Sequence, residues 1–203
     1  GRWARIDPDV WPTRFHAAVC SAAEIEALRG IKNVLRDGRV TALTADSIEM
    51  TGGSQAVTGT PLYVDCTASG GVKVDPKTQV FDDDVITLLI VRPFQPLFSA
   101  ALIAHLEFGD YNDTNRRFAT QVTNFHDTPA EFLDVQKQGF TNQYLWNQNK
   151  VLRNWIDASR LNAGPHLTAG LTREDTEKIN TLKAIGAMTA KAVENIPKML
   201  QSA

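Results

Sequence analysis

The sequence predicts a mixed α/β fold over residues 1–109, with a small antiparallel β ribbon and two buried strands, followed by an α-helical region over residues 110–203. Two observations carry this prediction. The first half contains many turn dipeptides and short segments in which apolar and polar residues alternate, as is typical of β structure. The second half has few such signals and repeats apolar residues at helical spacing. A chain of 203 residues is long enough for one sizeable core or two small ones.

Composition narrows the function classes. The 21 basic and 23 acidic residues give a net charge of −2 and are scattered, so we expect no nucleic-acid partner. The longest strongly apolar run, residues 85–91, is far shorter than a membrane span, which predicts a cytoplasmic protein without a transmembrane segment. Cys20 and Cys66 share no metal or disulfide spacing, so two buried free thiols are expected.

One short helix and the ribbon come first. Ser21 and Glu24 match a capping box and Gly30 follows as a stop signal, which predicts a helix at about residues 22–29. Asp-Gly and Gly-Gly pairs then separate alternating apolar residues in segments 34–40 and 47–54. Such pairs supply the positive φ angles of tight turns, so an antiparallel ribbon is expected there.

Two strands of another kind follow. Residues 61–66 end in a run of small residues, and residues 85–91 are apolar on both faces, as in a strand covered by helices on both sides. The Leu-, Ala- and Ile-rich segment from Pro96 to Phe108 then predicts a buried helix that closes at Gly109. A strand, a tight turn and an apolar helix form the repeating unit of layered α/β proteins.

Helices are expected throughout the remainder. Thr128 and Glu131 form a second capping box, and Gly139 is the predicted end of that helix. A further helix contains Leu152 and Ile156, and Thr172 is predicted to cap a long amphipathic last helix. Three aromatic residues on neighbouring turns are consistent with an exposed cap or interface, but we expect them in the core, because large aromatics are usually buried; they are Tyr144, Trp146 and Trp155.

Few side chains suggest chemistry by themselves. No three of the histidines and cysteines have zinc-ligand spacing, so no metal site is expected. His105 lies on the apolar helix and is interpreted as structural, and Asp82, Asp83 and Asp84 are interpreted as a solvated turn. The chain has no GxSxG elbow, no GxGxxG fingerprint and no phosphate-binding P-loop.

The remaining candidate is the segment 64–71, where a predicted strand ends in small residues and glycines. Small residues let a backbone approach a flat or phosphorylated ligand closely at the carboxyl edge of a sheet. An ordinary strand-to-loop turn explains the same residues, so the sequence leaves both interpretations open.

Three segments, residues 62–70, 80–88 and 98–107, resemble the C-terminal half of bacterial FAD/NAD(P)-binding oxidoreductases, and residues 31–40 fit the same region. The segment ending in Cys-Thr-Ala-Ser-Gly is similar to that family's strand ending in Ala-Thr-Gly. The family's N-terminal Rossmann segment, which carries the glycine fingerprint, has no counterpart in these 203 residues. The resemblance therefore implies that residues 1–109 are part of a Rossmann-like FAD-binding layer.

The resemblance also implies two sets of FAD-binding residues. The first would pass near the flavin pyrophosphate and consists of Thr67, Ala68, Ser69, Gly70 and Gly71. The second would place a helix N-terminus near the flavin ring and consists of Arg92, Pro93, Phe94, Gln95, Pro96 and Ser99. No catalytic residue follows from the resemblance, because in flavoenzymes the cofactor performs the redox chemistry.

The expected function is therefore that of the C-terminal portion of an FAD-dependent, NAD(P)H-linked oxidoreductase or monooxygenase that acts on a small molecule. Its expected partner is an N-terminal half or a second subunit that supplies the fingerprint. The helical region 110–203 would be a substrate cap or an interface between identical subunits. The alternative from another class is a non-catalytic module that binds a protein partner and holds no cofactor.

Overall fold

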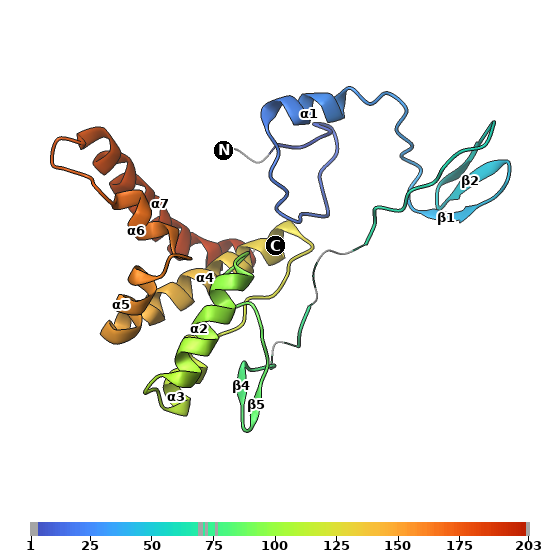
Figure 1. Cartoon of the computed structure of the whole chain (residues 1–203). Helices are drawn as coiled ribbons and strands as arrows, with labels where there is room; N and C mark the ends of the chain where they lie inside the picture. Colours follow the sequence, from blue (N-terminus) through green and yellow to red (C-terminus); the bar gives the residue numbers. More distant parts are fainter. Residues whose placement is uncertain (1–3, 69–70, 72, 76, 202–203) are drawn as a thin grey trace. The chain divides into compact units, whose positions relative to one another are not determined.

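The structure is a computed structural model that describes residues 4–68, 71, 73–75 and 77–201. It divides into two compact units, drawn in Figure 1. Within the described residues, the N-terminal unit comprises 4–12 and 18–68, and the C-terminal unit comprises 13–17, 71, 73–75 and 77–201. The C-terminal unit thus includes the segment 85–108, which the sequence analysis grouped with the first half.

The N-terminal unit contains one helix and one small sheet. Helix α1 (Ala22–Arg29) begins at the predicted capping box, with the Ser21 hydroxyl accepting from the Glu24 N–H and the Glu24 carboxylate accepting from the Ser21 N–H. The sheet confirms an antiparallel ribbon, but of the predicted segment 34–40 only Val40 lies in a strand. It is antiparallel in the order β1 (Val40–Leu43), β2 (Ser47–Met50) and β3 (Gly53–Ala56).

This unit has almost no core of its own. Met50 is the one buried hydrophobic residue among its described members. The strand predicted at residues 61–66 is absent from the described structure, because no second segment pairs with it there and its alternate side chains Leu62 and Val64 lie 89% and 72% exposed. The prediction of buried thiols is also wrong, since Cys20 and Cys66 are both exposed.

The predicted strand at residues 85–91 is shortened to a hairpin. Strand β4 (Phe81–Asp82) pairs with β5 (Val85–Ile86) across a turn in which Asp83 has a φ of 43°. The rest of the apolar run continues as irregular backbone, because no further strand flanks it among the described residues. Its last residue, Val91, is fully buried and leads into a turn before helix α2 (Pro96–Phe108), which has the predicted bounds.

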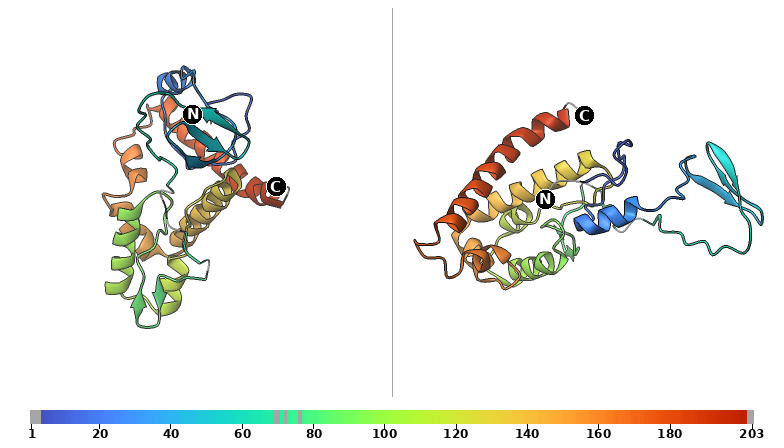
Figure 2. Two further views of the ribbon diagram at one scale, coloured as in Figure 1. Left: turned by 90° about the vertical axis from the view of Figure 1, so that its right-hand side faces the viewer. Right: turned by 90° about the horizontal axis from the view of Figure 1, so that it is seen from above.

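Helices make up the rest of the C-terminal unit (Figure 2). Helix α4 (Pro129–Gln148) packs against α3 (Asp113–Ala119), α5 (Lys150–Ala158) and α7 (Thr176–Gln201). It does not end at Gly139 as predicted: the glycine lies inside α4, where a Cβ would come within 2.8 Å of the Pro93 ring. The last helix begins four residues after Thr172. Helix α6 (Ala163–Thr168) lies between α5 and α7 in the sequence.

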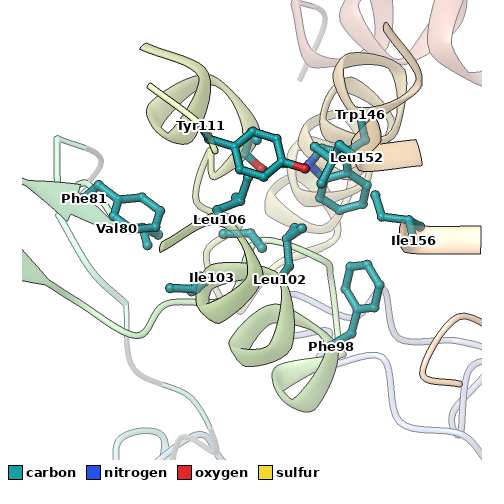
Figure 3. Close-up of a cluster of buried hydrophobic side chains, with 12 residues drawn as sticks. Val80, Phe81, Phe98, Leu102, Ile103, Leu106, Tyr111, Trp146, Leu152 and Ile156 are labelled. Atoms are coloured by element: carbon teal, nitrogen blue, oxygen red, sulfur yellow. Dashed lines mark hydrogen bonds between the residues drawn. The ribbon is translucent and has the colours of Figure 1, made fainter. Parts of the chain in front are cut away.

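The core of this unit lies between α2, α4 and α5, with the β4 hairpin at its edge (Figure 3). Helix α2 contributes one apolar face that includes Phe98 and Leu102, and Trp146 of α4 packs against Phe98 at 5.7 Å between ring centroids. Burial of Trp146 confirms the sequence prediction, whereas Tyr144 is 64% exposed and Trp155 packs at the edge of the core.

The coarse prediction is therefore confirmed: the fold is mixed α/β, with a small antiparallel sheet and with most of its helices in the C-terminal half. None of the helices that the structure describes has the length and apolar character that crossing a bilayer requires.

Candidate functional site

The side chain of Ser99, near the start of α2, holds the turn at residues 92–95 in place. The Ser99 hydroxyl accepts from the backbone N–H of Val91 at 3.1 Å and of Arg92 at 3.2 Å, and donates to the Gln95 carbonyl at 2.8 Å. Phe94 adopts a φ of 61°, a left-handed conformation that is costly for an aromatic residue. The turn is thus rigid and strained, a combination found at many functional sites.

Helix α2 begins at this turn, so the positive end of its backbone dipole faces the turn. No side chain caps this end of the helix. Gln95 occupies the capping position but makes no capping hydrogen bond, and the first turn of the helix holds no acidic residue. The partial positive charge of the helix N-terminus is therefore not neutralised locally. Such an end favours anionic or electron-rich atoms.

Arg92 is the first residue of the turn and is half buried. Its guanidinium carbon lies 4.4 Å from the centroid of the Phe98 ring, and its Nη2 donates to Asn162 Oδ1 at 3.1 Å. Its Nη1 is buried with no hydrogen-bond partner among the described residues, and burial lowers the pKa of Arg92. Arg92, Asn162 and Asp157 line an open hollow of about 540 Å³ next to α6.

His126 is enclosed by aromatic rings. Its ring centroid lies 5.0 Å from that of Phe132, 5.6 Å from Phe94 and 5.8 Å from Phe15, and the residue is 2% exposed. Neither ring nitrogen has a hydrogen-bond partner in the part of the chain that the structure describes. Burial is the main cause that lowers the pKa of His126, so the imidazole is neutral and offers one donor and one acceptor.

A charged cluster surrounds Asp127, the residue that follows His126. Asp127 accepts from Lys73 Nζ at 3.1 Å and lies 2.9 Å from His16 Nε2, and Lys73 also binds Glu131 at 2.8 Å. Arg14 completes the cluster at 3.6 Å from Asp127. The hydrogen bond from Lys73 is the main cause that holds the pKa of Asp127, and likewise that of Glu131, below its usual range.

The second predicted set of FAD-binding residues lies together at this turn, whereas the first set lies partly outside the described residues. Thr67 and Ala68 lie in the N-terminal unit, where Thr67 donates its N–H and hydroxyl to the Asp65 carboxylate. Gly71 lies in the C-terminal unit, and Ser69 and Gly70 lie outside the described residues. The cofactor role of both sets stays a prediction.

His126 was missed by the sequence analysis. Its only signal was its place directly before Asp127 and the capping box at Thr128, which positions it at the start of α4. The enclosing rings come from three separate segments, at Phe15, Phe94 and Phe132, and no local pattern brings those segments together.

The buried imidazole leads to a pH prediction. In the unfolded chain His126 binds a proton near pH 6.5, whereas in the folded protein it does so only at lower pH. Its contribution is therefore fully present above about pH 6.5 and is lost as the pH falls, with a slope of at most about 1.4 kcal/mol per pH unit. Urea unfolding between pH 5 and 8 should show this slope reduced in His126→Phe.

Other titratable groups also affect the pH dependence of stability, so the test needs a control variant. His16 and Lys73 lower the pKa of His126 further, whereas Glu131 and Asp127 oppose that shift. Burial also lowers the pKa of His105, so His126→Phe should keep part of the slope and a His105→Gln, His126→Phe double variant should lose more. An unchanged slope in His126→Phe would contradict the assignment.

Comparisons with known proteins show that this chain matches longer proteins of unknown function. The whole chain is 32% identical to uncharacterized proteins of Mycobacterium tuberculosis and Mycobacterium bovis, and it spans 38% of the length of these relatives. No protein-family model matches the chain. No solved structure matches it either.

Proposed function

We propose that the chain forms the C-terminal portion of an FAD-dependent, NAD(P)H-linked oxidoreductase or monooxygenase that acts on a small molecule. The observation that carries the proposal is the N-terminal unit, which has strands and exposed apolar side chains but almost no core. Met50 is its one buried hydrophobic residue, and Leu62 and Val64 project from an unpaired segment. A unit of this kind gains stability when a further layer covers those side chains.

The relatives agree with this proposal in length. They match the chain along its whole length and extend well beyond it, since the chain spans 38% of each. A further segment of the same polypeptide could pair with residues 61–66 as a Rossmann-like sheet and supply the glycine fingerprint. In that arrangement the segment from Thr67 to Gly71 would lie near the pyrophosphate.

The turn before α2 supports the flavin assignment. Its uncapped helix N-terminus and the absence of a first-turn carboxylate suit the electron-rich carbonyl oxygens of an isoalloxazine ring. Ser99 would act indirectly, because its hydroxyl already bonds to the backbone of the turn and so fixes its shape. FAD, when bound, supplies the hydride and electron transfer, and the chain's own residues orient the ring and exclude water.

The proposal is tested on the complete polypeptide encoded around this chain. We expect it to purify yellow, to release FAD on denaturation and to oxidise NADH or NADPH with FAD bound. Gln95→Glu would place a negative charge at the α2 N-terminus, which suits the helix dipole but repels an electron-rich ring, so FAD retention should fall without loss of stability.

The matched control is Asn147→Asp, which adds the same charge at an exposed position of α4. It should leave FAD retention unchanged. A polypeptide that releases no FAD and shows no saturable FAD binding would overturn the proposal.

A second candidate function, a module that binds a protein partner without a cofactor, is favoured by α7. This helix leaves Ile185, Met188 and Val193 about half exposed. Exposed apolar residues on one long helix are typical of an interface. A colourless protein that forms a stable dimer by light scattering, and becomes monomeric in Met188→Glu, would favour this function over the oxidoreductase.

A further inference from the structure

One hollow of the C-terminal unit lies away from the turn before α2. It has a volume of about 810 Å³ and is formed by residues 77–80 before β4, by α3 with the segment that follows it, and by α4. Ligand sites for small molecules have volumes of this order and combine apolar walls with a few polar groups. This hollow has both.

Its apolar surface comes from valines and one aromatic ring. Val80 and Val135 form buried parts of the lining, at 1% and 6% exposure. Phe118 of α3 also lines the hollow but is 54% exposed, so its ring is open to a ligand. An exposed aromatic face beside an apolar floor suits a planar ring.

Two cationic side chains, Lys77 and Arg117, line the same hollow, and acidic groups neutralise their charge only weakly. Lys77 has no ion-pair or hydrogen-bond partner for its amine in the described residues. The nearest carboxylate to Arg117 is that of Asp83, at 3.8 Å between Nη2 and Oδ1, with the Asp83 side chain 93% exposed. The one carboxylate in the lining, Asp134, lies 3.9 Å from Lys137 outside it. The lining therefore carries an excess of positive charge.

Two of the amide side chains in the polar lining, Gln121 and Gln138, are oriented by hydrogen bonds. Gln138 Nε2 donates to Gln121 Oε1 at 2.8 Å and to Asn142 Oδ1 at 3.0 Å. This fixes the orientation of both glutamines and leaves the Gln138 Oε1 acceptor and the Gln121 Nε2 donor without partners among the described residues. A ligand in the hollow could therefore bind one donor and one acceptor besides the cations.

We propose that this hollow binds an organic anion that consists of a planar ring bearing a phosphate or a carboxylate. The ring lies against Phe118 and the valines, and the anionic group binds Lys77 and Arg117. The proposal goes beyond the oxidoreductase function and does not depend on it, because no part of the hollow belongs to the turn before α2. A phosphorylated ring and an aromatic acid share this chemistry and are distinguished by the test.

The test is isothermal titration calorimetry of the 203-residue chain with four probes. These are 1-naphthyl phosphate and 1-naphthoate, which carry ring and charge, 1-naphthol, which carries the ring alone, and inorganic phosphate, which carries the charge alone. We expect saturable binding of at least one charged naphthyl compound, at least about tenfold tighter than either single-feature probe. The tighter of the two charged probes identifies the source as a phosphorylated ring or an aromatic acid.

Variants locate the binding. Lys77→Gln with Arg117→Gln should weaken the charged probe about tenfold or more and leave 1-naphthol unchanged, whereas Phe118→Ser should weaken both. Lys150→Gln with Arg153→Gln removes two exposed cations on α5 and is the matched control, expected to have no effect. Circular dichroism checks that each variant folds.

Two outcomes would overturn the proposal. One is equal affinity for 1-naphthol and the charged naphthyl probes. The other is unchanged affinity for the charged probe in the folded Lys77→Gln, Arg117→Gln variant. Because neither measurement involves flavin, failure here leaves the oxidoreductase proposal standing, and failure of that proposal leaves this one standing.

Discussion

Replacing Trp146 with alanine is expected to lower the free energy of unfolding of the C-terminal unit by about 3–5 kcal/mol. The side chain is 1% exposed and packs against Phe98 in the core, where it lies near Leu152 (Figure 3). Its indole N–H donates to the Ala119 carbonyl at 2.8 Å, which ties α4 to the end of α3. Truncation removes the packing and leaves that buried carbonyl without its donor.

Urea or thermal unfolding followed by far-ultraviolet circular dichroism measures the loss. Tyr144→Ala is the control, since Tyr144 is two residues away on the same helix but 64% exposed, and it should change stability by no more than about 0.5 kcal/mol. Trp146→Phe separates the two contributions because it keeps a ring and removes the N–H. Similar losses in Trp146→Ala and Tyr144→Ala would contradict the described core.

Local signals in the sequence predicted the elements whose formation is local. The capping box at Ser21 correctly marks the start of α1. Thr128 correctly marks the start of α4 as its N-cap, although the Glu131 carboxylate accepts from the Asp127 N–H and does not complete a box. The proline-led apolar segment correctly gives both ends of α2. These signals act within a few residues, because a cap side chain satisfies backbone groups of the first helical turn.

The strand predictions failed where the outcome depends on a distant partner. Residues 61–66 and 87–91 have the composition of buried strands, yet a strand forms only where another segment completes its ladder of hydrogen bonds. Gly139 failed for a related reason: it resembles a stop signal, but it serves the close approach of Pro93 to α4. Neither the missing strand partner nor the close approach of Pro93 can be predicted from the local sequence.

The same difference between local and distant signals applies to the candidate site. The resemblance, not a local pattern, singled out the turn from Arg92 to Ser99 as cofactor-binding, and that role stays a prediction. The structure shows that Ser99 holds the turn together. The aromatic enclosure of His126 and the charge pattern of the hollow at Lys77 and Arg117 arise from segments far apart in the chain. Such sites follow from packing, which periodicity and spacing alone do not determine.

Asn142 connects the two sites, and its replacement by leucine is expected to cost about 2–4 kcal/mol of stability. The residue is fully buried on α4. Its Nδ2 donates to the Val91 carbonyl at 2.7 Å and to the Gln121 carbonyl at 2.7 Å, and its Oδ1 accepts from Gln138 at 3.0 Å. One amide thus supports the residue before the strained turn and two residues that line the hollow.

Leucine has a similar size but leaves the Val91 and Gln121 carbonyls buried without these donors, which is why the loss should exceed that of an ordinary surface change. Asn147→Leu, at an exposed position of the same helix, is the control and should change stability by no more than about 0.5 kcal/mol. Denaturant titration measures both variants. Because Asn142 joins the turn to the hollow, Asn142→Leu should also weaken the charged naphthyl probe, and a variant with wild-type stability would show that this amide does not hold the two carbonyls.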